Sequence, residues 1–161
     1  MKKVRILFVC LGNICRSPLG AAILKQKIKI NHLDSWVEVD SCGTSNYHIG
    51  QHADPRTIAN ASRNGVPIVH SARQLIESDL ENFDFIFAMD KSNYENILRL
   101  ANGKDFQHKI KLMREFDGGN GLEVPDPYHG AEKDFQEVFE ILDRATSNFI
   151  DYLKQKYPDT V

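Results

Sequence analysis

The chain has 161 residues, a net charge of −2 from 20 basic and 22 acidic residues, and 42 % hydrophobic residues. These values are typical of a single globular domain over residues 1–161, and they argue against nucleic acid or an anionic membrane as a partner. Three cysteines cannot form a disulfide framework, and their spacing matches no zinc site. We therefore expect a reduced, cytoplasmic protein.

A secretory signal is not expected, although a basic start precedes an apolar run at the N-terminus. The run is short, Arg5 lies within it, and no small-residue cleavage site follows. No segment approaches the length needed to span a membrane.

Apolar runs alternate with helical patterns along the chain. In chain order we predict a buried strand at 4–10, a helix capped by Ser17 and ending near residue 31, a strand at 36–41, a helix at 54–65 and a short strand or extended piece at 68–70. A strand at 83–90, a helix at 92–102, a strand at 109–113, a loop over 114–130 and an amphipathic helix at 131–156 are predicted to follow. This order favours an α/β fold with a four-stranded parallel sheet covered by helices on both faces. Ligands of such sheets bind beyond the carboxyl ends of the strands.

The segment VCLGNICRSP begins at such an end, where the first strand meets a helix. The unpaired N–H groups and positive dipole of a helix start favour an anion. Gly12 and Asn13 can take left-handed conformations that turn N–H groups inward, and the Arg16 fork can bind two phosphate oxygens. Cys10 would lie beneath that anion in a field that favours its thiolate, with Ser17 donating to the sulfur.

The spacing Cys-x5-Arg alone is a weak pattern, but its position between a strand and the start of a helix makes it informative. A phosphate loop of the Walker type needs Gly-Lys-Ser/Thr, which the chain lacks. The remaining alternative is a core cysteine that ends a strand, with Arg16 as a solvated helix charge.

VCLGNICRSP resembles the signature V-C-x-G-N-x-C-R-S-P of the low-molecular-weight protein tyrosine phosphatases. DSCGTSNYHIG, ADPR, HSARQL, FDFIFAMDKSN and VPDPYHG follow in the order of that family, at suitable spacing. The resemblance implies a flavodoxin-like fold of the phosphatase type I kind, phosphotyrosine proteins as substrates, and no metal or organic cofactor.

Asp126 is the candidate general acid, because displacement of a tyrosyl oxygen needs a proton donor. It lies in a loop between Pro125 and Pro127, where a plain turn-forming aspartate is the alternative. The resemblance assigns it the acid and base role, with Cys10 as the nucleophile and Arg16 as the phosphate clamp.

The resemblance assigns further roles around these three residues. The phosphate-binding loop comprises Leu11, Gly12, Asn13, Ile14, Cys15 and Ser17, with Leu11 and Ile14 at the mouth. Ser41 and His70 would donate hydrogen bonds that hold Asn13, and Asp90 would lie near the loop. Tyr47 and Tyr128 would flank the substrate ring, and we expect phosphate or another oxyanion in the loop and a monomeric protein.

Three further positions, His129, Cys42 and Cys15, are interpreted individually. His129 stands where many eukaryotic members have a second tyrosine, so it alters the rim and makes regulation by a phosphorylated tyrosine pair doubtful. Cys42 replaces the alanine usual in the family, and we interpret it as a small buried substitute. Cys15 is either a packing residue or a resolving thiol that traps oxidised Cys10 as a disulfide.

Three rival functions remain open. An arsenate reductase of the same fold typically needs a close pair of downstream cysteines, and no cysteine follows Cys42. A phosphocysteine carrier of a sugar phosphotransferase system would not need Arg16 together with Asp126. A catalytically dead phosphotyrosine-binding module would lack the nucleophile or the acid, and both are present.

Overall fold

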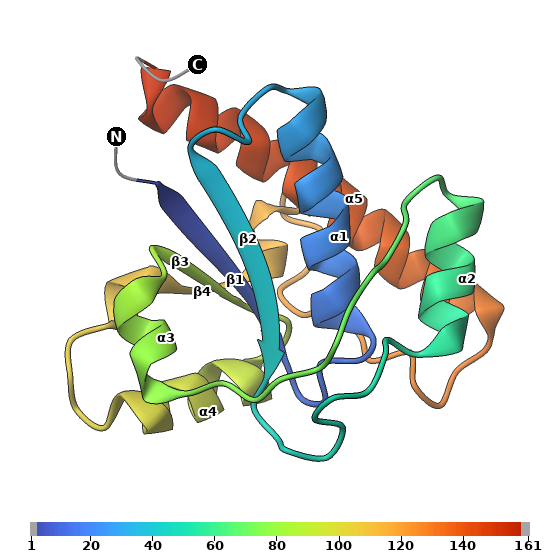
Figure 1. Ribbon diagram of the computed structural model, residues 1–161, viewed down its shortest axis with the longest axis horizontal. Helices are drawn as coiled ribbons and strands as arrows, with labels where there is room; N and C mark the ends of the chain where they lie inside the picture. Colours follow the sequence, from blue (N-terminus) through green and yellow to red (C-terminus); the bar gives the residue numbers. More distant parts are fainter. Residues whose placement is uncertain (1–2, 159–161) are drawn as a thin grey trace.

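A computed structural model describes residues 3–158, in which four parallel strands form one sheet (Figure 1). The strands are β1 (Val4–Cys10), β2 (Val37–Gly43), β3 (Phe85–Ala88) and β4 (Ile110–Leu112), in the spatial order β2-β1-β3-β4. β1 pairs with both β2 and β3, so the strand that ends at Cys10 is central. The predicted four-stranded parallel sheet is confirmed.

Helices α1 (Arg16–Ile30) and α5 (Glu132–Lys156) cover one face of the sheet (Figure 1). Ile6 and Phe8 of β1 point into this layer, where aromatic side chains of β3 and α5 pack edge to face. The ring of Phe149 lies 4.9 Å from that of Phe87 and 5.3 Å from that of Phe116. Helix α2 (Pro55–Arg63) packs outside this layer, against α5.

Helices α3 (Glu77–Asn82) and α4 (Lys91–Ala101) cover the opposite face. Leu7 and Val9 alternate with Ile6 and Phe8 along β1 and enter this second apolar layer together with Leu80 of α3. Because both faces of β1 are buried, its sequence is an almost unbroken apolar run, and helices on both faces are confirmed.

The sequence missed α3 and misjudged several boundaries. Residues 68–70 form no strand, and short 3-10 helices occur at η1 (Gln107–Lys109) and η2 (Met113–Phe116), the second largely within the predicted loop. The prediction that Ser17 caps α1 is wrong. The cap position is Cys15, and Ser17 lies inside the helix with its hydroxyl buried toward Cys10.

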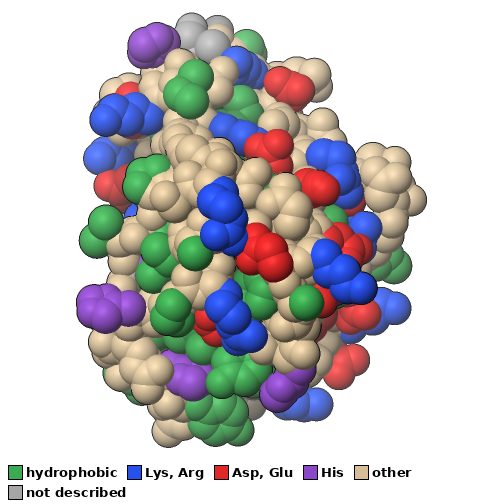
Figure 2. Space-filling model, turned by 90° about the vertical axis from the view of Figure 1, so that its right-hand side faces the viewer, with side chains coloured by type: hydrophobic (Ala, Val, Ile, Leu, Met, Phe, Trp, Pro, Cys, Tyr) green, Lys and Arg blue, Asp and Glu red, His purple; other side chains and the backbone are tan. Residues whose placement is uncertain are grey.

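Acidic and basic side chains are interleaved on the face shown in Figure 2, with no expanse of a single charge. Hydrophobic and histidine side chains gather at its lower end, which corresponds to the end of the molecule where β1 and β2 terminate in Figure 1. Within residues 3–158, no helix is long and apolar enough to cross a membrane.

Replacement of Phe149 by alanine is expected to lower the free energy of unfolding by about 3–5 kcal/mol, because it removes the centre of the aromatic layer and leaves a cavity. Urea denaturation followed by circular dichroism measures the change. The control is Ile30→Ala on α1, where the side chain is 68 % exposed and the expected change is within about 0.5 kcal/mol. Equal losses in the two variants would contradict the assigned core.

Candidate active site

The loop between β1 and α1 carries the predicted site residues to the carboxyl edge of the sheet. Cys10 is the last residue of β1 and is 3 % exposed, and Arg16 begins α1. Within residues 3–158, no hydrogen bond has a backbone N–H group of residues 12–16 as its donor. These free donors and the start of the α1 dipole form an anion-binding cradle above Cys10.

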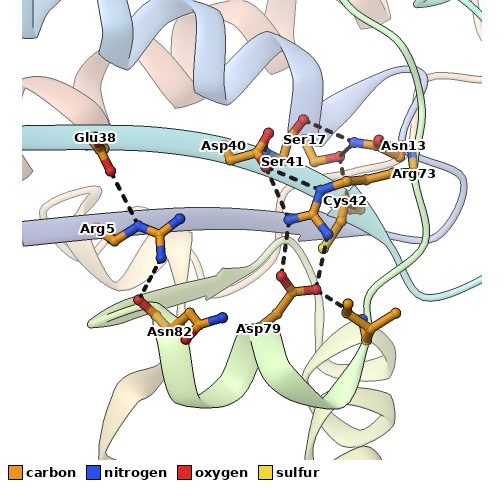
Figure 3. Close-up of polar contacts among 11 residues, drawn as sticks. Arg5, Asn13, Ser17, Glu38, Asp40, Ser41, Cys42, Arg73, Asp79 and Asn82 are labelled. Atoms are coloured by element: carbon orange, nitrogen blue, oxygen red, sulfur yellow. Dashed lines mark hydrogen bonds and ion pairs between the residues drawn. The ribbon is translucent and has the colours of Figure 1, made fainter.

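Asn13 sets the shape of this loop. Its φ angle is 58°, in the left-handed region that few non-glycine residues adopt. The side-chain amide donates to Ser41 Oγ at 3.0 Å, and Asn13 Oδ1 accepts from the backbone N–H of Arg73 at 3.0 Å (Figure 3). His70 Nε2 lies 2.7 Å from the Asn13 carbonyl oxygen. Contacts from two other parts of the chain thus hold the strained residue.

Ser17 links Asn13 to the sulfur of Cys10. Ser17 Oγ accepts from the Asn13 amide at 2.8 Å and lies 2.9 Å from Cys10 Sγ. Because the amide donates to Ser17, the hydroxyl's own proton can point at the sulfur, which lies closer than the other acceptor of this hydroxyl, the Cys42 carbonyl oxygen at 3.4 Å. Such a donor stabilises a thiolate.

Arg16 connects the loop to two other segments. Its guanidinium donates to Asp90 Oδ2 at 2.7 Å and to the Val124 carbonyl oxygen at 2.9 Å, and it lies 3.8 Å from Asp126 Oδ2. Burial acts to lower the pKa of Arg16, but the negative charges of Cys10 and Asp90 outweigh it, so the pKa is raised. The guanidinium therefore remains charged in a buried position.

Asp126 lies at the rim with its carboxylate oriented by its own turn. Its Oδ1 accepts from the backbone N–H of Tyr128 at 3.1 Å, which leaves Oδ2 toward Arg16. The side chain is 50 % exposed, so it can exchange protons with solvent.

Cys10, Arg16 and Asp126 line one pocket of about 270 Å³. Its floor and walls are formed by Cys10, Leu11, Gly12, Ile14, Cys15, Arg16, Tyr47, His48, Asp126, Tyr128 and His129. Within the described part of the chain, no group of three or more His, Cys, Asp or Glu side chains is arranged to hold a metal ion.

Residues 5–159 match the profile of the family described as low molecular weight phosphotyrosine protein phosphatase. The chain belongs to this family. A low molecular weight phosphotyrosine protein phosphatase from Schizosaccharomyces pombe is 40 % identical over 151 residues, which cover 92 % of this chain and 96 % of the relative. The members are enzymes that act on phosphotyrosine proteins, and this chain is a protein-tyrosine phosphatase by family.

Solved structures of related phosphatases share the fold. A protein tyrosine phosphatase from Entamoeba histolytica with Hepes in its active site superposes with a TM-score of 0.92, at 41 % identity over 96 % of this chain and 99 % of that one. Wzb from Vibrio vulnificus, in complex with benzylphosphonate, has a TM-score of 0.81 and 28 % identity over 93 % of this chain and 99 % of that one.

The phosphatase loop differs from prediction in two details. Gly12 does not adopt a left-handed conformation, and its missing side chain instead leaves room for His48, since a Cβ there would lie 2.9 Å from His48 Cδ2. Ser41 was expected to donate to Asn13, but the Asn13 amide is the donor. Six of the other predicted residues line the pocket, namely Leu11, Ile14, Cys15, Tyr47, Tyr128 and His129. Ser17, Ser41 and His70 contact Asn13, and Asp90 accepts a hydrogen bond from Arg16.

Sequence reasoning missed His48 and Arg73. His48 lines the pocket and bonds Gln51 at 2.9 Å. The Arg73 guanidinium binds Asp79 at 3.0 Å and Asp40 at 3.0 Å, which fixes the backbone N–H that meets Asn13 (Figure 3). Arg73 lies in HSARQL and His48 in DSCGTSNYHIG, two segments that carry the family resemblance, so a signal for both residues is present in the sequence.

His70 makes the stability of this phosphatase depend on pH. Burial holds the pKa of His70 below its ordinary value of 6.5, and the hydrogen bond to the Asn13 carbonyl opposes burial without cancelling it. As the pH falls below 6.5, His70 is protonated in the unfolded chain before it is protonated in the folded protein. The free energy of unfolding therefore decreases until the pH reaches the lower pKa of His70 in the folded state. Well above pH 6.5 the contribution of His70 to the free energy of unfolding is present in full.

We therefore expect the stability advantage of wild type over His70→Gln to shrink between about pH 7.5 and about pH 5.5. Urea denaturation of both proteins at the two pH values gives the difference in free energy of unfolding. A constant difference would show that His70 does not titrate in this window.

Proposed function

We propose that the chain hydrolyses phosphotyrosine on proteins through a phosphocysteine intermediate on Cys10. The observation that carries this proposal is the single pocket in which Cys10 lies beneath free backbone donors, next to Ser17, with Arg16 and Asp126 at hand. In the first step the Cys10 thiolate attacks phosphorus while Asp126 protonates the leaving tyrosyl oxygen. The sulfur–phosphorus bond forms as the phosphorus–oxygen bond breaks.

In the second step Asp126, now a carboxylate, takes a proton from water that attacks the phosphocysteine. Inorganic phosphate leaves and the thiolate is restored. Arg16 and the N–H groups of the loop stabilise the equatorial oxygens in both steps. The buried and charged state of Arg16 suits this role, because a clamp in a low dielectric acts strongly on developing charge.

The residues around the pocket are proposed to act by positioning the catalytic residues Cys10 and Arg16. Asn13 and Ser17 orient the sulfur, and Ser41 and His70 support Asn13. Asp90 orients the Arg16 guanidinium through its hydrogen bond of 2.7 Å.

Tyr47 and Tyr128 are proposed to flank the phosphotyrosine ring. Both line the pocket, and both are among the exposed large side chains of the protein. We infer that this rim favours phosphotyrosine, because a phosphoserine side chain is shorter and has no ring for the two tyrosines to flank. Hepes carries a sulfonate and benzylphosphonate a phosphonate on a benzyl group, so the ligands of the two related enzymes resemble the phosphate and the ring of this substrate.

Residues 1–161 are proposed to act as one monomeric domain in the cytoplasm. All three cysteines are free thiols, and a reducing compartment keeps Cys10 reactive. An arsenate reductase activity is disfavoured, because no cysteine follows Cys42 to relay a disulfide.

Hydrolysis of p-nitrophenyl phosphate in EDTA is expected for the wild type. Cys10→Ser should abolish turnover, because it removes the nucleophile, and Asp126→Ala should lower kcat by about 10²-fold or more. Release of p-nitrophenolate, followed by absorbance, measures all three. Turnover that survives in Cys10→Ser would exclude the mechanism, and arsenate reduction without ester hydrolysis would support the reductase.

We also propose that Cys15 protects Cys10 from overoxidation. Burial, joined by the charge of Asp54, raises the pKa of Cys15 to about 12, so Cys15 remains a thiol. Both cysteines line the same pocket. Peroxide converts Cys10 to a sulfenic acid, and condensation with the Cys15 thiol releases water and forms a disulfide.

Peroxide inactivation of wild type should therefore be reversed by dithiothreitol, whereas Cys15→Ser should recover to a smaller extent. The assay is p-nitrophenyl phosphate turnover after matched peroxide exposure, with mass spectrometry to count sulfinic acid on Cys10. Cys42→Ser is the matched control and should recover like wild type, because Cys42 is fully buried in the layer beneath α3 and α4. Equal recovery in Cys15→Ser would refute protection by Cys15.

A further inference from the structure

A second hollow, of about 580 Å³, adjoins the reaction pocket and shares Leu11 and Tyr47 with it. We call it the α4 groove, because its far wall is the C-terminal half of α4. The lining consists of Leu11, Thr44, Ser45, Asn46, Tyr47, Gln74, Leu75, Asn96, Arg99 and Leu100. In Figure 1, α4 lies beside the end of β2, at the edge of the sheet where Cys10 ends β1.

The near wall of the α4 groove is attached to the loop that carries Cys10. The backbone N–H of Thr44 donates to the Cys10 carbonyl oxygen at 2.9 Å. Ser45 donates to the Leu11 carbonyl oxygen twice, from its N–H at 3.0 Å and from its hydroxyl at 2.9 Å. A chain seated in the groove is therefore held in a fixed position relative to the nucleophile.

Arg99 gives the α4 groove its charge. It is the one charged side chain in the lining formed by the described residues, and it is exposed. Its guanidinium donates to Asn96 Oδ1 at 2.6 Å, and within residues 3–158 it forms no ion pair with a carboxylate. Most of its donors thus face the groove or solvent, and a carboxylate is a partner that a guanidinium fork can bind through two parallel hydrogen bonds.

We propose that the α4 groove binds the substrate polypeptide next to the phosphotyrosine, and that Arg99 selects an Asp or Glu side chain there. This inference rests on the proposed function. A pocket of about 270 Å³ accepts the phosphorylated ring, so the substrate backbone must leave over the rim. The groove begins at two residues of that rim, Leu11 and Tyr47, and offers apolar contact near the pocket and positive charge farther out.

The test uses phosphotyrosine peptides in which one glutamate is moved through about four positions on either side, at about 3.3–3.6 Å of reach per residue. Matched peptides carry glutamine at each position. At one or two neighbouring positions on one side, wild type should show a kcat/KM about twofold to fivefold higher for glutamate, a preference that weakens as salt screens the charge. Arg99→Gln should abolish the preference, and Arg99→Glu should shift it toward lysine.

Two controls separate this inference from the proposed function. Hydrolysis of p-nitrophenyl phosphate, which has no flanking chain, should be unchanged in Arg99→Gln. Lys29→Gln removes one exposed positive charge from the last turn of α1, away from the α4 groove, and should keep the glutamate preference.

A glutamate preference that persists in Arg99→Gln, or no preference at any position in wild type, overturns the inference while p-nitrophenyl phosphate turnover continues. Failure of wild type on both peptides and p-nitrophenyl phosphate overturns the proposed function and the inference with it.

Discussion

The left-handed backbone of Asn13 is the constraint on which the site depends. A φ of 58° is unfavourable for residues with a side chain, by about 1–2 kcal/mol, although asparagine tolerates it better than most. Ser41 on β2 and the segment that contains His70 and Arg73 hold the residue there. Because the same amide donates to Ser17, the fixed Asn13 also orients the hydroxyl that faces Cys10. The contacts that hold Asn13 in its strained conformation therefore also align the sulfur of Cys10.

Arg73 extends this support outward to α3. Burial acts to lower the pKa of Arg73, but the hydrogen bonds to the Asp79 carboxylate together with the charges of Asp40 and Asp79 raise it, so the Arg73 guanidinium stays charged. Gly43, the last residue of β2, packs closely against the phosphate-binding loop, where a Cβ would lie 2.7 Å from the Leu11 carbonyl oxygen. The end of β2 can therefore lie directly against the phosphate-binding loop.

The sequence predicted the sheet and the Cys10 loop because both have strong local signals, namely apolar strands and a motif at a strand end. It missed α3, where Leu80 is the one apolar residue among six, so no periodic pattern exists. Ser17 followed by Pro18 has the local signature of a helix start, and a buried contact with Cys10 overrides it. The position of His48 over Gly12 depends on how two loops meet, which local sequence does not encode.

The most direct test of the account is to trap the reaction intermediate on Cys10. Asp126→Ala enzyme turning over an aryl phosphate, denatured rapidly in alkali, should give a ³¹P resonance of an S-phosphorylated cysteine, and peptide mapping should place it on Cys10. The same treatment of Cys10→Ser should give no such signal. Phosphate found on another residue, or hydrolysis in wild type with no thiophosphate at any stage, would contradict the account.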